Sequence, residues 1–197
     1  MNRNEMCAFA SAEYEAGSGD AQSGFTLLEL IIVVIILTVI TAASVPNLIS
    51  YLANVHLGQA ADALYGNMQH AKLRAVKENR SFAIVFDRGA GQYQVCSENG
   101  DGDWTTAADN TVEKTVTLAD YASDVAFGHG DAGLAIGSDF GDDVTYASPD
   151  DVLVFNARGM SNSGYVYLNN GHNSAYGIGT RISGLVEMRR WAGSDWQ

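Results

Sequence analysis

An uninterrupted apolar run near the start of the sequence constrains the chain more than any other feature. It extends from Phe25 to Val45, 21 residues in which Glu29 is the only charged side chain. As a helix that rises about 1.5 Å per residue, the run would span roughly 30 Å, the thickness of the hydrocarbon core of a bilayer. A carboxylate at the centre of such a span costs about 2.5–3.5 kcal/mol, and less near an end. Because the run contains no Lys, Arg or His, a partner for Glu29 has to come from outside it.

The residues at the start of this run resemble a known signal. Gly24-Phe25-Thr26-Leu27-Leu28-Glu29 followed by apolar residues is similar to the class III signal of type IV pilins and type II secretion pseudopilins. The resemblance implies that a prepilin peptidase cuts between Gly24 and Phe25 and methylates the new amino terminus on Phe25. It also implies that Glu29 meets the terminal amine of Phe25 in a neighbouring subunit as a filament assembles. Pro46 stands where this family tends to carry a helix-softening proline, and we expect a helix break there.

The signal and the hydropathy pattern divide the chain into four parts. We expect a leader at residues 1–24 that is removed, a membrane-spanning assembly helix at residues 25–45, an amphipathic helix at residues 46–79, and a β-rich domain at residues 80–197. The leader departs from related leaders, because it has no Lys or Arg close before the cut.

Charge asymmetry indicates how the chain is oriented. No Lys or Arg occurs between Pro46 and Ala71, and basic residues mark the cytoplasmic side of a membrane segment. We therefore expect a single-pass protein of the bacterial inner membrane with a cytoplasmic N-terminus. The C-terminal domain is expected in the periplasm, incorporated in a pseudopilus.

The residues after Pro46 predict an α+β fold. Apolar residues recur there at helical spacing to about Glu78, which is typical of an amphipathic helix. From Ser81 the period changes to two, which predicts a hairpin of residues 82–86 and 92–96. Further strands are expected at residues 152–155 and 165–168, with a final hairpin at residues 175–191. The expected architecture is one long N-terminal helix packed on an antiparallel β-sheet domain, as in pilins. The apolar positions of the amphipathic helix are Leu48, Leu52, Val55, Leu64, Met68, Ala71 and Ala75.

Residues 97–150 stand out by their acidity. Thirteen acids fall between Glu98 and Asp151, against Lys114 as the single base. Glycine is frequent, and only residues 112–118 and 125–127 have the composition of short strands. We therefore interpret this region as an acidic loop insertion in the β-rich domain.

A second resemblance lies in the C-terminal third. Three segments look like the C-terminal domain of minor pseudopilins of the GspH/FimT type, which share a phenylalanine, a glycine and a serine, a strand, and a glycine in the turn of a final hairpin. With the N-terminal signal, the resemblance covers residues 24–88 and 152–191. The three segments are Phe155–Ser161, Gly164–Leu168 and Arg181–Glu187.

Together these features favour a structural role as a minor pseudopilin of a type II protein secretion system, assembled through its N-terminal helix. The expected partners are the prepilin peptidase, other pseudopilin or pilin subunits, and the inner membrane. No cofactor is expected.

The alternative is a FimT-like minor pilin of a type IV pilus or competence system that binds DNA. It would use Arg181, Arg189 and Arg190, with Trp191 and Trp196 available for base stacking. Against it stand Leu185 and Glu187, where such relatives tend to have basic residues. The net charge of −12 also opposes it, since nucleic-acid affinity rests largely on neutralised phosphates. Residues 1–24 carry −3 of that charge, which leaves −9 after the cut.

An enzymatic role finds little support. No two histidines have the spacing of a metal-binding pair, and the sequence shows no nucleophile next to a catalytic base. Two acidic spots could offer oxygen ligands to Ca²⁺, but neither completes a known calcium loop, so solvated acidic loops are the favoured interpretation. Cys7 lies in the leader, so Cys96 alone would remain and no internal disulfide can form. The histidines are His56, His70, His129 and His172, and the weak calcium candidates are Asp101 and Asp103 in one spot and Asp142 and Asp143, with Asp139, in the other.

Overall fold

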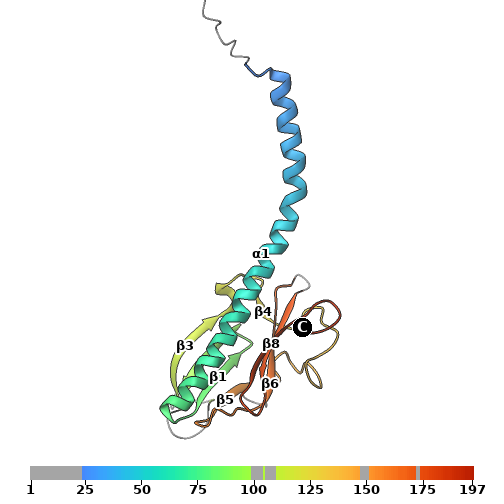
Figure 1. Ribbon diagram of the computed structural model, residues 1–197. Coiled ribbons are helices and arrows are strands. Elements are labelled where there is room, and N and C mark those ends of the chain that lie inside the picture. Colours follow the sequence, from blue (N-terminus) through green and yellow to red (C-terminus); the bar gives the residue numbers. More distant parts are fainter. Residues whose placement is uncertain (1–23, 99–103, 105–109, 147–150, 172–173) are drawn as a thin grey trace, which may run out of the picture. The chain divides into compact units, whose positions relative to one another are not determined.

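The computed structural model describes residues 24–98, 104, 110–146, 151–171 and 174–197 (Figure 1). The chain divides into two compact units, residues 1–42 and residues 43–197, which we call the N-terminal unit and the head unit. One long helix, α1 (Leu27–Glu78), contributes to both. The remaining elements are β1 (Phe82–Asp87), β2 (Gln92–Ser97), β3 (Thr111–Thr117), the 3-10 helix η1 (Leu118–Asp120), β4 (Ala126–Phe127), β5 (Val152–Phe155), β6 (Gly164–Asn169), β7 (Ala175–Thr180) and β8 (Val186–Arg190).

Helix α1 is continuous through Pro46. The helix break that the sequence suggested at this position is therefore absent. A proline inside a helix still removes one backbone hydrogen bond, so local softening of α1 at Pro46 stays a prediction.

The described part of the N-terminal unit is an apolar helix without a polar face. Its large side chains are exposed, and the helix is long and apolar enough to cross a membrane. Its two inner hydroxyl groups are satisfied within the helix, because Thr38 Oγ1 donates to the Val34 carbonyl at 3.0 Å and Thr41 Oγ1 to the Leu37 carbonyl at 2.9 Å. Polar groups that are paired inside their own helix cost little in lipid.

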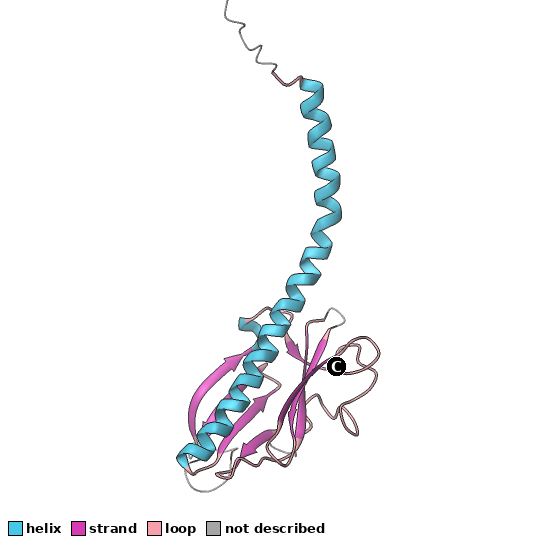
Figure 2. Ribbon diagram, in the orientation of Figure 1, coloured by secondary structure: helices cyan, strands magenta, loops and turns pink. Residues whose placement is uncertain are grey.

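The head unit contains two four-stranded sheets. The strand orders are β3-β2-β1-β5 and β4-β6-β7-β8, and every neighbouring pair is antiparallel. Figure 2 shows the C-terminal half of α1 lying across these strands. The predicted α+β class and the predicted hairpins β1–β2 and β7–β8 are thus confirmed.

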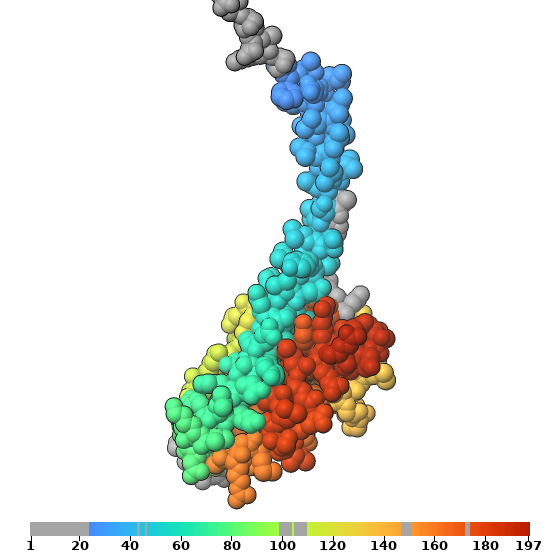
Figure 3. Space-filling model, viewed as in Figure 1, coloured from blue at the N-terminus to red at the C-terminus, as the bar shows by residue number. Residues whose placement is uncertain are grey.

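The core lies between α1 and the two sheets. Leu57, Leu64 and Met68 of α1 are fully buried in one cluster with Phe82 of β1 and Ile178 of β7. Small residues on the same helix face, Ala60, Ala61, Ala71 and Ala75, are also fully buried. Figure 3 shows α1 held between the yellow β3 segment and the red C-terminal segment.

Two sequence interpretations need correction here. Leu48 and Leu52 were assigned to the buried face of the amphipathic helix, but they are 56% and 43% exposed, and burial begins at Ala53. Helical spacing alone does not distinguish an apolar side chain that faces a core from one that faces lipid. The acidic region was interpreted as a loop insertion, but it also supplies the buried core residues Leu118 and Tyr146. The two short strands expected within it, at residues 112–118 and 125–127, are present as β3 and β4.

Candidate assembly segment and head surfaces

Thr26 determines where α1 begins. The backbone N–H of Glu29 donates to Thr26 Oγ1 at 3.1 Å, and the N–H of Leu30 donates to the Thr26 carbonyl at 3.1 Å. Thr26 is therefore the N-cap and Glu29 the third helical residue. This is the Thr-x-x-Glu spacing of a capping box, a pattern readable in the sequence that our interpretation missed. A carboxylate in the first turn also interacts favourably with the positive end of the helix dipole.

Glu29 sits at the edge of a wide apolar surface. Within the described part of the chain, no Lys, Arg or His forms an ion pair with its carboxylate, and its apolar neighbours Leu28 and Leu30 are 68% and 60% exposed. The residue just before the helix, Phe25, is 80% exposed. Gly24 and Phe25 thus precede a helix whose large apolar side chains are exposed in the part of the chain that the structure describes.

The segments that carry the C-terminal resemblance meet at one joint in the head unit. Lys72 Nζ of α1 donates to the carbonyl of Gly184 in the β7–β8 turn at 2.9 Å. Ser161 Oγ in the β5–β6 loop donates to the Arg181 carbonyl at 2.9 Å. Gly184 has φ +76°, and a Cβ atom there would lie 1.8 Å from the carbonyl oxygen of Gly159. The turn glycine is therefore required by the close approach of two backbones.

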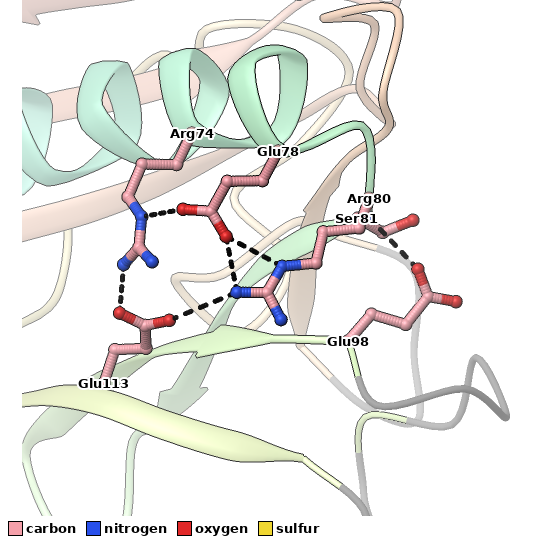
Figure 4. A network of polar contacts seen from close by, with 6 residues as sticks. All are labelled: Arg74, Glu78, Arg80, Ser81, Glu98 and Glu113. Carbon is pink, nitrogen blue, oxygen red and sulfur yellow. Dashed lines mark hydrogen bonds and ion pairs between the residues drawn. The ribbon is translucent and has the colours of Figure 1, made fainter.

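The basic residues at the end of α1 form a network with acids (Figure 4). Arg74 Nε lies 2.7 Å from Glu78 Oε1, Arg80 Nε lies 2.9 Å from Glu78 Oε2, and Arg74 also bonds Glu113 of β3. The guanidinium groups of Arg74 and Arg80 lie 4.6 and 5.1 Å from the ring centre of buried Phe82. Hydrogen bonds from Arg74 hold the pKa of Glu78 and that of Glu113 below their usual values. This network joins the end of α1 to β1 and β3, and both of its arginines form ion pairs with glutamates.

Two of the three C-terminal arginines are also paired. Arg181 bonds Glu187, and Arg189 Nη2 lies 3.2 Å from Glu187 Oε2. The hydrogen bond from Arg181, and to a smaller extent that from Arg189, lowers the pKa of Glu187 below its ordinary range. Arg190 is exposed and forms no ion pair with any residue that the structure describes.

The tryptophans do not serve as a stacking surface. Trp191 and Trp196 are each 7% exposed and pack against one another with ring centres 5.4 Å apart. They are buried because the chain end folds back, with backbone hydrogen bonds between Arg190 and Gln197. The expectation that both rings were available for nucleic-acid bases is therefore wrong.

The structure separates the acidic residues considered for calcium. Arg88 pairs with Asp142, whereas Asp143 Oδ1 lies 2.6 Å from His129 Nδ1. Asp139 accepts a hydrogen bond from the Gly141 N–H in its own turn. Among the described residues no three His, Cys, Asp or Glu side chains are grouped as metal ligands. Asp101, Asp103 and His172 lie outside the described residues.

Comparison with known proteins identifies the family. Residues 60–185 match the sequence model of the type II transport protein GspH, and residues 20–45 match the prokaryotic N-terminal methylation motif. No match was found among curated protein sequences.

Solved structures with a similar fold include two minor subunits. The minor pseudopilin EpsH from the type 2 secretion system of Vibrio cholerae has 13% identity and a TM-score of 0.49, over 71% of this chain and 99% of that chain. The type IV minor pilin FimU of Pseudomonas aeruginosa has 13% identity and a TM-score of 0.49, over 73% of this chain and 94% of that chain. The family assignment itself rests on the sequence match, which spans more than half of the 197 residues and includes the joint at Gly159 and Gly184. The chain therefore belongs to the GspH family of type II transport proteins and carries its N-terminal methylation motif.

Proposed function

We propose that this protein is a minor pseudopilin, a structural subunit that joins the pseudopilus of a type II secretion system through α1. The observation that carries the proposal is the exposed apolar surface of residues 27–45 with Glu29 as its only charge. Lipid covers such a surface in the membrane, and the equivalent helices of other subunits would cover it in a filament.

Processing creates the counter-charge for Glu29. A prepilin peptidase would cut between Gly24 and Phe25 and N-methylate Phe25, which leaves an ammonium group just before the Thr26 N-cap. The N-terminus of α1 is an unfavourable place for this ammonium group, because the positive end of the helix dipole lies there. The carboxylate of Glu29 in a neighbouring subunit would form an ion pair with this amine. Such a pair, buried between two helices and away from lipid, would fix the register of the two helices.

The DNA-binding alternative has less support from the residues that were expected to carry it. Glu187 occupies Arg181 and Arg189, and Trp191 and Trp196 are buried. Of the three arginines, Arg190 alone forms no ion pair within residues 24–98, 104, 110–146, 151–171 and 174–197. One guanidinium on a chain of this acidity is a weak basis for affinity to phosphates.

Cysteine crosslinking in native membranes tests the assembly role. The mature chain keeps only Cys96, which is 2% exposed, so a cysteine placed at exposed Val39 reports contacts of α1 specifically. We expect crosslinked adducts with sister pseudopilins for Val39→Cys, and their loss when Glu29→Gln is added. The matched control is Thr41→Val, which also removes a polar group from α1. Equal adducts with and without Glu29→Gln would contradict the pairing mechanism.

A further inference from the structure

A hollow of about 360 Å³ lies on the head unit between α1 and the end of the second sheet. It is lined by Tyr51, Asn54 and Val55 of α1 and by Tyr176 and Arg190 of the β7–β8 pair. We call it the α1–β8 groove. The hydrogen bond from Asn170 Nδ2 to Asn54 Oδ1, 2.9 Å long, anchors the helix beside it.

Arg190 occupies an unusual position in its strand. Alternation along β8 places Val186, Met188 and Arg190 on one face, and the first two pack into the core beneath α1. Arg190 is directly opposite Tyr176 in the strand pairing, so both side chains lie on the face toward α1. A Cβ at Gly58 would lie 3.7 Å from the Tyr176 hydroxyl, which shows that the Tyr176 side chain extends to the surface of α1. The groove therefore holds, beside two tyrosines, a cation that forms no ion pair with the residues described.

The groove begins a short way along α1 from the apolar run. If the hydrocarbon core ends at Val45, Tyr51 is six residues further along α1, about 9 Å. The headgroup layer adds roughly 5–8 Å on each side of a bilayer, and tilt of the helix shortens the separation. Leu48, Ile49 and Leu52 are all exposed between or beside these positions. Tyr51, 63% exposed, is of a residue type enriched at membrane interfaces.

We propose that the α1–β8 groove binds the phosphate group of a membrane phospholipid, with Arg190 as its cation and the hydroxyls of Tyr51 and Tyr176 as further donors. Guanidinium groups form paired hydrogen bonds with phosphate oxygens, and the exposed apolar residues beside Tyr51 would contact the glycerol and upper acyl chains. This inference rests on the proposed insertion of α1 in the membrane. Lipid bound here would hold the head unit at the membrane until the subunit is extracted into a filament.

Native mass spectrometry of the full mature chain, in detergent with added phosphatidylglycerol, tests the proposal. We expect Arg190→Gln to lower the fraction of lipid-bound protein at least about threefold, and Arg190→Lys to retain most of it. Tyr51→Ala provides a second variant. The matched control is Arg158→Gln. Arg158 is exposed and adjoins Gly159, which lies next to Val76 of α1. Val76 is 21 residues from Val55 along α1, about 30 Å, so Arg158 lies far from the groove.

Other occupants are distinguished in the same experiment. Excess inorganic phosphate should leave the lipid bound, since a free anion lacks the apolar contacts. Equal lipid retention in Arg190→Gln and the unaltered chain would overturn the proposal, as would displacement of the lipid by inorganic phosphate or by duplex DNA. The Val39→Cys crosslinking assay separates the two ideas, because Arg190→Gln should still form adducts while Glu29→Gln should still bind lipid.

Discussion

Replacement of Gly184 by alanine tests the joint where the turn of the final hairpin meets the β5–β6 loop. The new Cβ would lie 1.8 Å from the Gly159 carbonyl oxygen, whereas ordinary contacts of a Cβ begin near 3.4 Å. The obstacle is backbone, so the turn or the loop must move. Overpacking of this kind costs about 1–3 kcal/mol, and the left-handed backbone at φ +76° adds about 1–2 kcal/mol for alanine. We expect a total loss of about 2–5 kcal/mol.

The matched control for this prediction is Gly91→Ala. Gly91 has φ +63°, but no atom lies within 4 Å of its Cβ position. Its alanine variant therefore carries the backbone penalty without the collision. In thermal unfolding of the full mature chain, followed by tryptophan fluorescence, Gly184→Ala should melt roughly 2–12 °C below Gly91→Ala. Equal melting temperatures for the two variants would show that Gly159 and Gly184 are not in close contact.

Two further predictions concern the network at the end of α1 and the buried thiol. Glu113→Gln should destabilise the chain by less than about 1 kcal/mol at pH 7, as expected for partly exposed ion pairs. Because the pKa of Glu113 is lower in the folded than in the unfolded chain, its contribution is present above about pH 4.5 and is lost as the pH falls below that value. Urea unfolding at pH 7 and pH 3 should thus give a difference between variant and unaltered chain only at pH 7; a larger difference at pH 3 would contradict the assignment. Cys96 should resist maleimide at pH 7, since burial raises the pKa of its thiol and shields it. Mass spectrometry after short labelling checks this, with a cysteine at exposed Ser183 as the reactive control, and rapid modification of Cys96 would refute its burial.

The sequence predicted those features that depend on local pattern. Helix α1 and the β1–β2 hairpin follow from a change of hydrophobic period near Ser81. The turn at Gly184 was readable because glycine marks a tight hairpin. The apolar helix of residues 27–45 was likewise predicted, whereas its role in assembly stays a prediction.

Features that depend on distant neighbours were not readable. Leu48 and Leu52 continue the helical spacing of Leu64 although they lie beyond the edge of the core. Strand β3 was readable as a short strand, but its place at the edge of a sheet, which leaves most of it exposed, was not. The burial of Trp191 depends on the chain end folding back, which no local pattern indicates.

Arg190 illustrates the same limit from the side of function. In the sequence it is one of three arginines that read as a basic cluster. In the structure Glu187 forms ion pairs with Arg181 and Arg189, while Arg190 faces α1 beside Tyr51. Which of the three arginines can bind a ligand therefore depends on their ion pairs with Glu187, which the composition does not reveal.

The central claim is that a peptidase creates a free amine at Phe25 for Glu29 of another subunit to meet. Intact mass spectrometry of the chain extracted from its native membrane measures this directly. We predict a polypeptide that begins at N-methylated Phe25, and an unprocessed precursor for Gly24→Ala. A chain that retains Met1, or that begins at any residue other than Phe25, would contradict the account.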